Sequence, residues 1–154
     1  MRMHFRIFII MLLLSSCQQN ESDFLKNINS LSLIQVSKSN DFNSDKTIYT
    51  FFNTTCHYCQ IEIKEIKDNS ELEFRDISFI LISDENIEVL KEFIKTENLV
   101  KINNIKIYKC DELEFFQTFP ASKTPTSWVI ENNKCIYREL GWTPMKKLLS
   151  KFKE

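Results

Sequence analysis

The chain has 154 residues, with 20 Lys and Arg against 21 Asp and Glu, so its formal net charge is −1 at neutral pH. This length suits one domain with a substantial hydrophobic core. The charges form no basic tract, so the sequence gives no signal for a nucleic-acid partner.

The first 17 residues predict an export signal. A basic start precedes an apolar run over 7–14, which is too short to span a bilayer because a spanning helix needs about 20 residues. The ending Leu14-Ser15-Ser16-Cys17 resembles the lipobox of bacterial lipoproteins. That resemblance implies cleavage before Cys17 and attachment of lipid to this residue. The alternatives are an ordinary secretory signal and a short, uncleaved anchor.

We therefore divide the chain into a signal peptide (1–16), a lipidated Cys17 with its tether (17–30) and a folded domain (31–154). Thiols outside the cytoplasm meet an oxidising environment. Of the cysteines after Cys17, only Cys56 and Cys59 are close in sequence, and the other two are Cys110 and Cys135.

Strands and helices alternate along the predicted domain. Patterns of apolar, β-branched and aromatic residues predict strands over 31–36, 47–52, 77–82, 105–108, 126–130 and 135–139. Helices are predicted over 56–68, over a segment capped by Asp84 that includes 87–94, and over 112–119 and 144–152. This order indicates an α/β fold with a largely parallel sheet, and the turn at 132–134 makes the last two strands an antiparallel hairpin.

The Cys56–Cys59 pair falls where a buried strand passes into a helix. At a helix N-terminus, free N–H groups and the helix dipole favour an anion such as a thiolate. Cys-x-x-Cys thiols in this position have pKa values of roughly 3.5 to 7, against about 8.5 for a free thiol. One helical turn of spacing also lets Cys59 reach Cys56 to form a disulfide.

The segment FFNTTCHYCQIE (51–62), followed by KTPTSWVI (123–130) and a hairpin that reaches Gly141-Trp142, resembles the thioredoxin superfamily. Within it, the chain is most similar to the exported TlpA/ResA-type thiol-disulfide oxidoreductases, over about 31–152. The resemblance implies a thioredoxin-like fold: a central mixed sheet with a terminal antiparallel hairpin, flanking helices and a helix–strand insertion. The helix and strand between Asp84 and Tyr108 would form this insertion.

The same resemblance implies roles for single residues. Thr124-Pro125 matches the cis-proline loop, which faces the CxxC and holds the substrate chain, and Glu62 matches an acidic residue implicated in proton handling. Tyr58 stands where the family often has proline, so the thiol pKa and the redox potential do not carry over. We expect Tyr58 to lie exposed beside the sulfurs and to touch substrate. His57, as an imidazolium, would favour the Cys56 thiolate and make the pair more oxidising.

Plainer readings of these residues remain open. The CxxC could be half of a zinc site, but zinc needs two further ligands and the other cysteines are isolated, so we expect no metal and no cofactor. Pro125 could be an ordinary trans proline, Glu62 a solvated carboxylate on its helix, and His57 an exposed spacer.

These observations predict a lipid-anchored thiol-disulfide oxidoreductase of the cell envelope or periplasm, with Cys56 as nucleophile and Cys59 as resolving thiol. The resemblance implies that its substrates are exported proteins with dithiols or disulfides, such as apocytochromes with CxxCH sites, and that a membrane redox donor or acceptor is its second partner. The alternatives are a disulfide oxidant and a non-catalytic peptide-binding lipoprotein of the same fold.

Cys110 and Cys135 are predicted to be unbonded to each other. Cys110 follows the carboxyl end of a parallel strand, whereas Cys135 follows the turn at the other end of the sheet. At about 3.3 Å per strand residue, the two ends lie roughly 15 Å apart, and a disulfide needs Cα atoms within about 7 Å.

Overall fold

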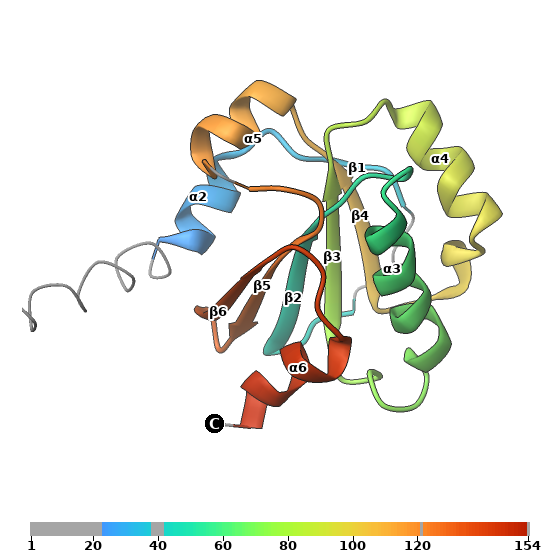
Figure 1. Ribbon diagram of the computed structural model, residues 1–154, viewed down its shortest axis with the longest axis vertical. Helices are drawn as coiled ribbons and strands as arrows, with labels where there is room; N and C mark the ends of the chain where they lie inside the picture. Colours follow the sequence, from blue (N-terminus) through green and yellow to red (C-terminus); the bar gives the residue numbers. More distant parts are fainter. Residues whose placement is uncertain (1–22, 38–41, 121, 154) are drawn as a thin grey trace, which may run out of the picture.

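The computed structural model describes residues 23–37, 42–120 and 122–153 (Figure 1). Its described part forms a six-stranded mixed sheet in the order β1-β4-β3-β2-β5-β6. The three central strands β2, β3 and β4 run parallel, and β1, β5 and β6 each run antiparallel to a neighbour. The strands are β1 (Ile34–Gln35), β2 (Lys46–Phe51), β3 (Ser78–Ser83), β4 (Ile105–Lys109), β5 (Thr126–Glu131) and β6 (Lys134–Leu140).

Helices cover both faces of this sheet (Figure 1). They are α2 (Phe24–Ser30), α3 (His57–Asn69), α4 (Ile87–Thr96), α5 (Glu112–Thr118) and α6 (Met145–Leu149), with short 3-10 turns at Leu99–Lys101 and Ser150–Lys153. The predicted α/β fold, with its central mixed sheet, terminal hairpin and helix–strand insertion, is confirmed. Among the described residues, no helix has both the length and the apolar character needed to cross a membrane.

Two hydrophobic clusters, one on each face, hold the layers together. Side chains alternate along β3, so Phe79 and Leu81 belong to one cluster and Ile82 to the other. The first cluster packs the sheet against α3, α4 and α6. The second packs it against α2 and α5 and is largely aromatic, with Phe51 stacked on Phe115 at 3.9 Å between ring centroids. The strand that leads to the CxxC is therefore buried on both sides.

Residues 24–30, which the sequence analysis assigned to the tether, form helix α2. Phe24 and Ile28 are buried in the second cluster, and the Phe24 ring stacks on Trp128 at 5.0 Å. These residues therefore belong to the packed domain, and any tether ends before them. The signal peptide and Cys17 lie outside the described residues, so the division at residue 16 stays a prediction.

Two other local expectations were wrong. The cap of α4 is Asn86, not Asp84, because Glu85 is held by Ser83 and Thr54 and keeps the chain non-helical beyond Asp84. The strand expected over 31–36 is reduced to two residues at the sheet edge, where it pairs only with β4.

Cys110 and Cys135 lie at the ends of the sheet at which the sequence analysis placed them. Cys110 directly follows β4, whose last residue Lys109 is level with Ser83 at the end of β3. Cys135 pairs with Ile130, which is level with Thr47 at the start of β2. The two cysteines thus lie at opposite ends of the sheet, and no disulfide joins them.

Candidate active site

The CxxC lies at the carboxyl end of β2, in a loop that is held from both sides. The backbone N–H and the hydroxyl of Thr54 both donate to the Glu85 carboxylate, each at 2.7 Å. From the other side, Gln60 Nε2 donates to the Thr54 carbonyl at 2.7 Å. These bonds fix the point at which the chain leaves the sheet and enters α3.

Cys56 occupies the N-cap of α3. Its Sγ accepts a hydrogen bond from the backbone N–H of Cys59 at 3.3 Å, the contact through which a helix N-terminus stabilises an anion. Cys56 is half-buried, whereas Cys59 is only 1% exposed. Burial, and then the hydrogen bond with Cys56, raise the pKa of the Cys59 thiol well above its ordinary value. Solvent and substrate can therefore reach Cys56 and not Cys59.

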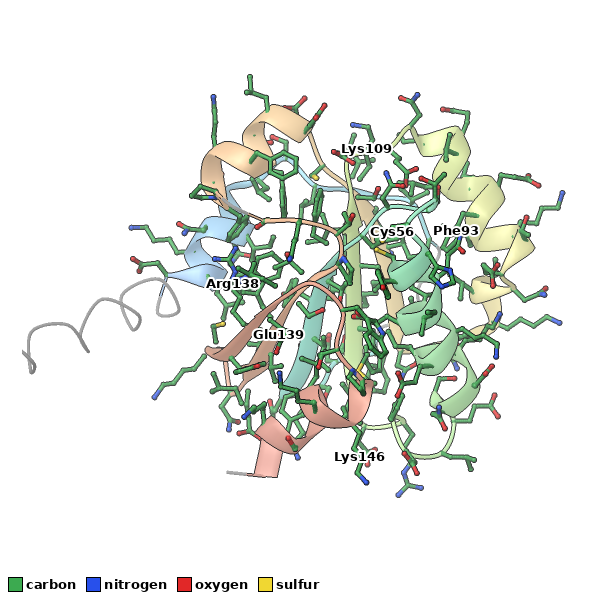
Figure 2. All side chains as sticks on the ribbon, in the orientation of Figure 1. Cys56, Phe93, Lys109, Arg138, Glu139 and Lys146 are labelled. Carbon is green, nitrogen blue, oxygen red and sulfur yellow. The ribbon has the colours of Figure 1, made fainter. Side chains whose placement is uncertain are left out.

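The loop before β5 faces this thiol, which Figure 2 labels at the start of α3, near the middle of the view. The Thr124-Pro125 peptide bond is cis, as the resemblance implied. The Cys56 thiol donates to the Thr124 carbonyl oxygen at 3.7 Å, although the two residues are 68 positions apart. On the far side of the loop, the Gly141 N–H donates to the Pro125 carbonyl at 2.8 Å. Cys56, Thr124 and Pro125 are thus brought together.

Glu62 lies in the interior, and the solvated reading of it is wrong. Its side chain is 1% exposed, and its Oε1 accepts hydrogen bonds from the hydroxyls of Thr50 on β2 and Ser127 on β5, each at 3.0 Å. The two hydroxyls are themselves 2.9 Å apart. Burial raises the pKa of the Glu62 carboxyl to about 7, against the opposing effect of the two hydroxyls. A carboxyl with this pKa exchanges its proton near neutral pH, one helical turn after Cys59.

His57 and Tyr58, the residues between the two cysteines, are both exposed. The Tyr58 ring lies 5.7 Å from the His57 ring and 5.9 Å from the ring of Trp142, with which it is nearly parallel at 25°. Sequence reasoning used Trp142 only as part of the resemblance and assigned it no role. A sequence signal was present, since an aromatic residue follows the lone glycine beside the predicted hairpin.

A hollow of about 450 Å³ opens beside Cys56. It is lined by Phe51, Asn53, Thr55, Cys56, Asp84, Glu112, Phe116, Lys123 and Thr124. Partial burial raises the pKa of the Asp84 carboxyl. The negative charges of Glu112 and Glu85 raise it further, and the positive charge of Lys109 lowers it.

Among the described residues, no group of three or more His, Cys, Asp or Glu side chains is arranged to hold a metal ion.

This arrangement of strands, CxxC helix and cis-proline loop defines a thioredoxin-like fold. No family model matches the sequence, and no curated protein matches it. Solved structures do match.

A thiol-disulfide isomerase from Corynebacterium glutamicum has a TM-score of 0.59 at 13% identity, over 79% of this chain and 92% of that one. The exposed lipoprotein thioredoxin of Streptococcus pneumoniae has a TM-score of 0.57 at 14% identity, over 73% and 87%. A secreted disulfide oxidoreductase from Mycobacterium tuberculosis has a TM-score of 0.56 at 10% identity, over 71% and 82%. At identities this low the likeness shows the fold, which is the one that the resemblance implied.

Proposed function

We propose that this chain is a thiol-disulfide oxidoreductase, exported and anchored to a membrane by Cys17, that uses the Cys56–Cys59 dithiol. One observation carries the proposal: an accessible cysteine caps a helix, accepts the N–H of a buried second cysteine, and lies 3.7 Å from the carbonyl of a cis-proline loop. The names of the similar structures, which include a secreted protein and an exposed lipoprotein, support the location.

The reaction follows from the different environments of the Cys56 and Cys59 thiols. The Cys56 thiolate attacks one sulfur of a substrate disulfide, the substrate S–S bond breaks, and a mixed disulfide forms as one substrate thiolate leaves. Cys59 then attacks Cys56 Sγ, which releases the second substrate thiol and leaves Cys56–Cys59 oxidised. Two electrons pass to the substrate, and the two protons of the dithiol end on the two substrate thiols. The reverse sequence oxidises a substrate dithiol.

Glu62 serves the second step. Burial disfavours the Cys59 thiolate, and the charge of an ionised Glu62 disfavours it further, so Cys59 must lose its proton as it attacks. Glu62 lies one turn away on the same helix and its pKa of about 7 suits proton transfer at neutral pH. It therefore takes up the proton that Cys59 gives off and passes it, by way of solvent, to the departing substrate thiolate. In the reverse reaction it returns a proton to Cys59.

The substrates are disulfides of exported proteins, with apocytochromes as one class, and a membrane redox partner restores the starting state of the pair. Thr124 and Pro125 hold the substrate chain beside Cys56. The exposed position of His57, next to the nucleophile, supports a role in setting the potential of the couple.

The test uses three single variants of the reduced chain in an insulin-reduction assay with a thiol donor. Cys56→Ser abolishes turnover. Cys59→Ser, mixed with insulin without the donor, accumulates mixed disulfides that resolve only on adding reductant. Cys135→Ser, a half-buried cysteine at the other end of the sheet, is the matched control and keeps its turnover. Full activity of Cys59→Ser with no trapped partner would refute the two-thiol mechanism. An inactive wild type that still binds peptides would favour the non-catalytic alternative.

A further inference from the structure

The exposed aromatic side chains of the described residues gather in one place. The sequence has 13 Phe, 4 Tyr and 2 Trp. Tyr58 is 55% exposed and Trp142 is 41% exposed, and the other large apolar side chains that are exposed in the described part are aliphatic. Exposed aliphatic residues scattered singly are normal, but a stacked aromatic pair in water exposes a concentrated apolar surface that interfaces commonly use.

The backbone fixes this pair beside the reacting sulfur. Tyr58 projects from the first turn of α3, two residues after Cys56. Trp142 follows Gly141, whose N–H is bonded to Pro125 and whose φ of +90° favours glycine. The ring stack at 5.9 Å therefore connects the CxxC helix to the segment bonded to the cis-proline loop.

The chemistry of disulfide exchange determines what meets this surface. In the mixed disulfide, the substrate sulfur is bonded to Cys56 Sγ at about 2 Å, and consecutive Cα atoms of the substrate are about 3.8 Å apart. A residue next to the substrate cysteine therefore lies within about a side chain's length of Cys56, and Tyr58 comes two residues after Cys56 in the first turn of α3. The hollow on the Asp84 and Lys123 side, which Phe116 also lines, carries charges of both signs.

Resting on the proposed function, we infer that Tyr58 and Trp142 form a docking surface for an apolar side chain, preferably aromatic, that flanks the attacked cysteine of the substrate. The surface flanks the CxxC and is connected through Gly141 to the cis-proline segment, and so its occupant is the substrate chain itself. Ile61, one turn after Tyr58 on α3 and 36% exposed, extends the same apolar face. The pair thus selects among exported disulfides by the residue beside the cysteine.

The test compares three disulfide-linked peptide homodimers that differ only in the residue after the cysteine: Trp, Ser or Lys. The purified reduced chain should show a kcat/KM for the Trp peptide roughly 2- to 10-fold above that for the Ser peptide, the range for one aromatic contact. Trp142→Ala and, independently, Tyr58→Ala should bring this ratio close to one. A ratio between peptides cancels any change in the reactivity of Cys56 itself.

Leu72→Ala, which removes an even more exposed apolar side chain outside the site, is the matched control and should keep the wild-type ratio. A wild-type ratio of one, a preference for the Lys peptide, or a ratio unchanged in both aromatic variants would overturn the inference while the proposed function stands. A wild type that exchanges with none of the peptides and does not reduce insulin would overturn the proposed function and, with it, this inference.

Discussion

Replacing Glu62 by Gln tests the buried carboxyl through the stability of the fold. Burial raises the pKa of Glu62 from 4.5 to about 7 in the folded chain. Between these two values the folded chain keeps a proton that the unfolded chain has lost, so the free energy of unfolding falls as the pH rises. The stabilisation is complete below pH 4.5 and is lost as the pH rises through about 7.

The magnitude follows from the same two values. Because the pKa of Glu62 rises by about 2.5, and each unit of pKa corresponds to about 1.36 kcal/mol, the free energy of unfolding changes by about 3 kcal/mol between pH 4 and pH 8. Gln does not titrate, and its amide oxygen can still accept the hydrogen bonds from Thr50 and Ser127. The free energy of unfolding of Glu62→Gln minus that of the wild type should therefore rise by about 3 kcal/mol over this range.

Urea denaturation of both reduced chains at intervals from pH 4 to pH 8 measures this difference, and subtraction cancels the groups that the two chains share. Glu71→Gln, which removes an exposed carboxyl, controls for the change in net charge. A difference that stays constant within about 1 kcal/mol from pH 4 to pH 8 would refute the reasoning, because a buried carboxyl with a raised pKa must produce the slope.

Three further outcomes are expected. His57→Ala should lower the reduction potential of the Cys56–Cys59 couple by about 30 mV, a tenfold change in equilibrium with glutathione, and an unchanged potential would return His57 to the status of a spacer. Cys17→Ala should abolish labelling of the chain by radioactive fatty acid and release it from the membrane fraction, and unlabelled wild type would indicate an ordinary signal peptide. Non-reducing peptide mapping of the oxidised chain should find no peptide that links Cys110 to Cys135.

Local patterns were sufficient for most of the sheet. Strands such as Ser78–Ser83 are continuous apolar runs buried on both faces, and the hairpin turn uses Asn132 and Asn133, both at positive φ. Helix α2 was missed because a seven-residue segment is too short to display a helical period, and its stability comes from the packing of Phe24 and Ile28 in the second cluster.

For the candidate site too, local sequence patterns were sufficient for some residues, whereas others depend on tertiary packing. The CxxC was found because two cysteines at that spacing are unusual, and the cis-proline loop was found through the resemblance to the thioredoxin superfamily. The burial of Glu62 could not be found from its helix, since its partners Thr50 and Ser127 are 12 and 65 positions away. The contact between Tyr58 and Trp142 likewise depends on how α3 meets the segment after β6, which only tertiary packing determines.

Helix α2 also limits how far the folded domain can extend from a lipid attached to Cys17. Phe24 is buried against Tyr49, Phe119 and Trp128 and comes seven residues after Cys17. Seven residues span at most about 25 Å even when fully extended, which is less than the roughly 30 Å thickness of the hydrocarbon layer of a bilayer. With lipid on Cys17, the short connection would keep the domain in a thin layer next to the membrane surface. Its substrates would therefore have to approach that surface. Extra flexible residues inserted between Cys17 and Phe24 would widen that layer without touching the fold.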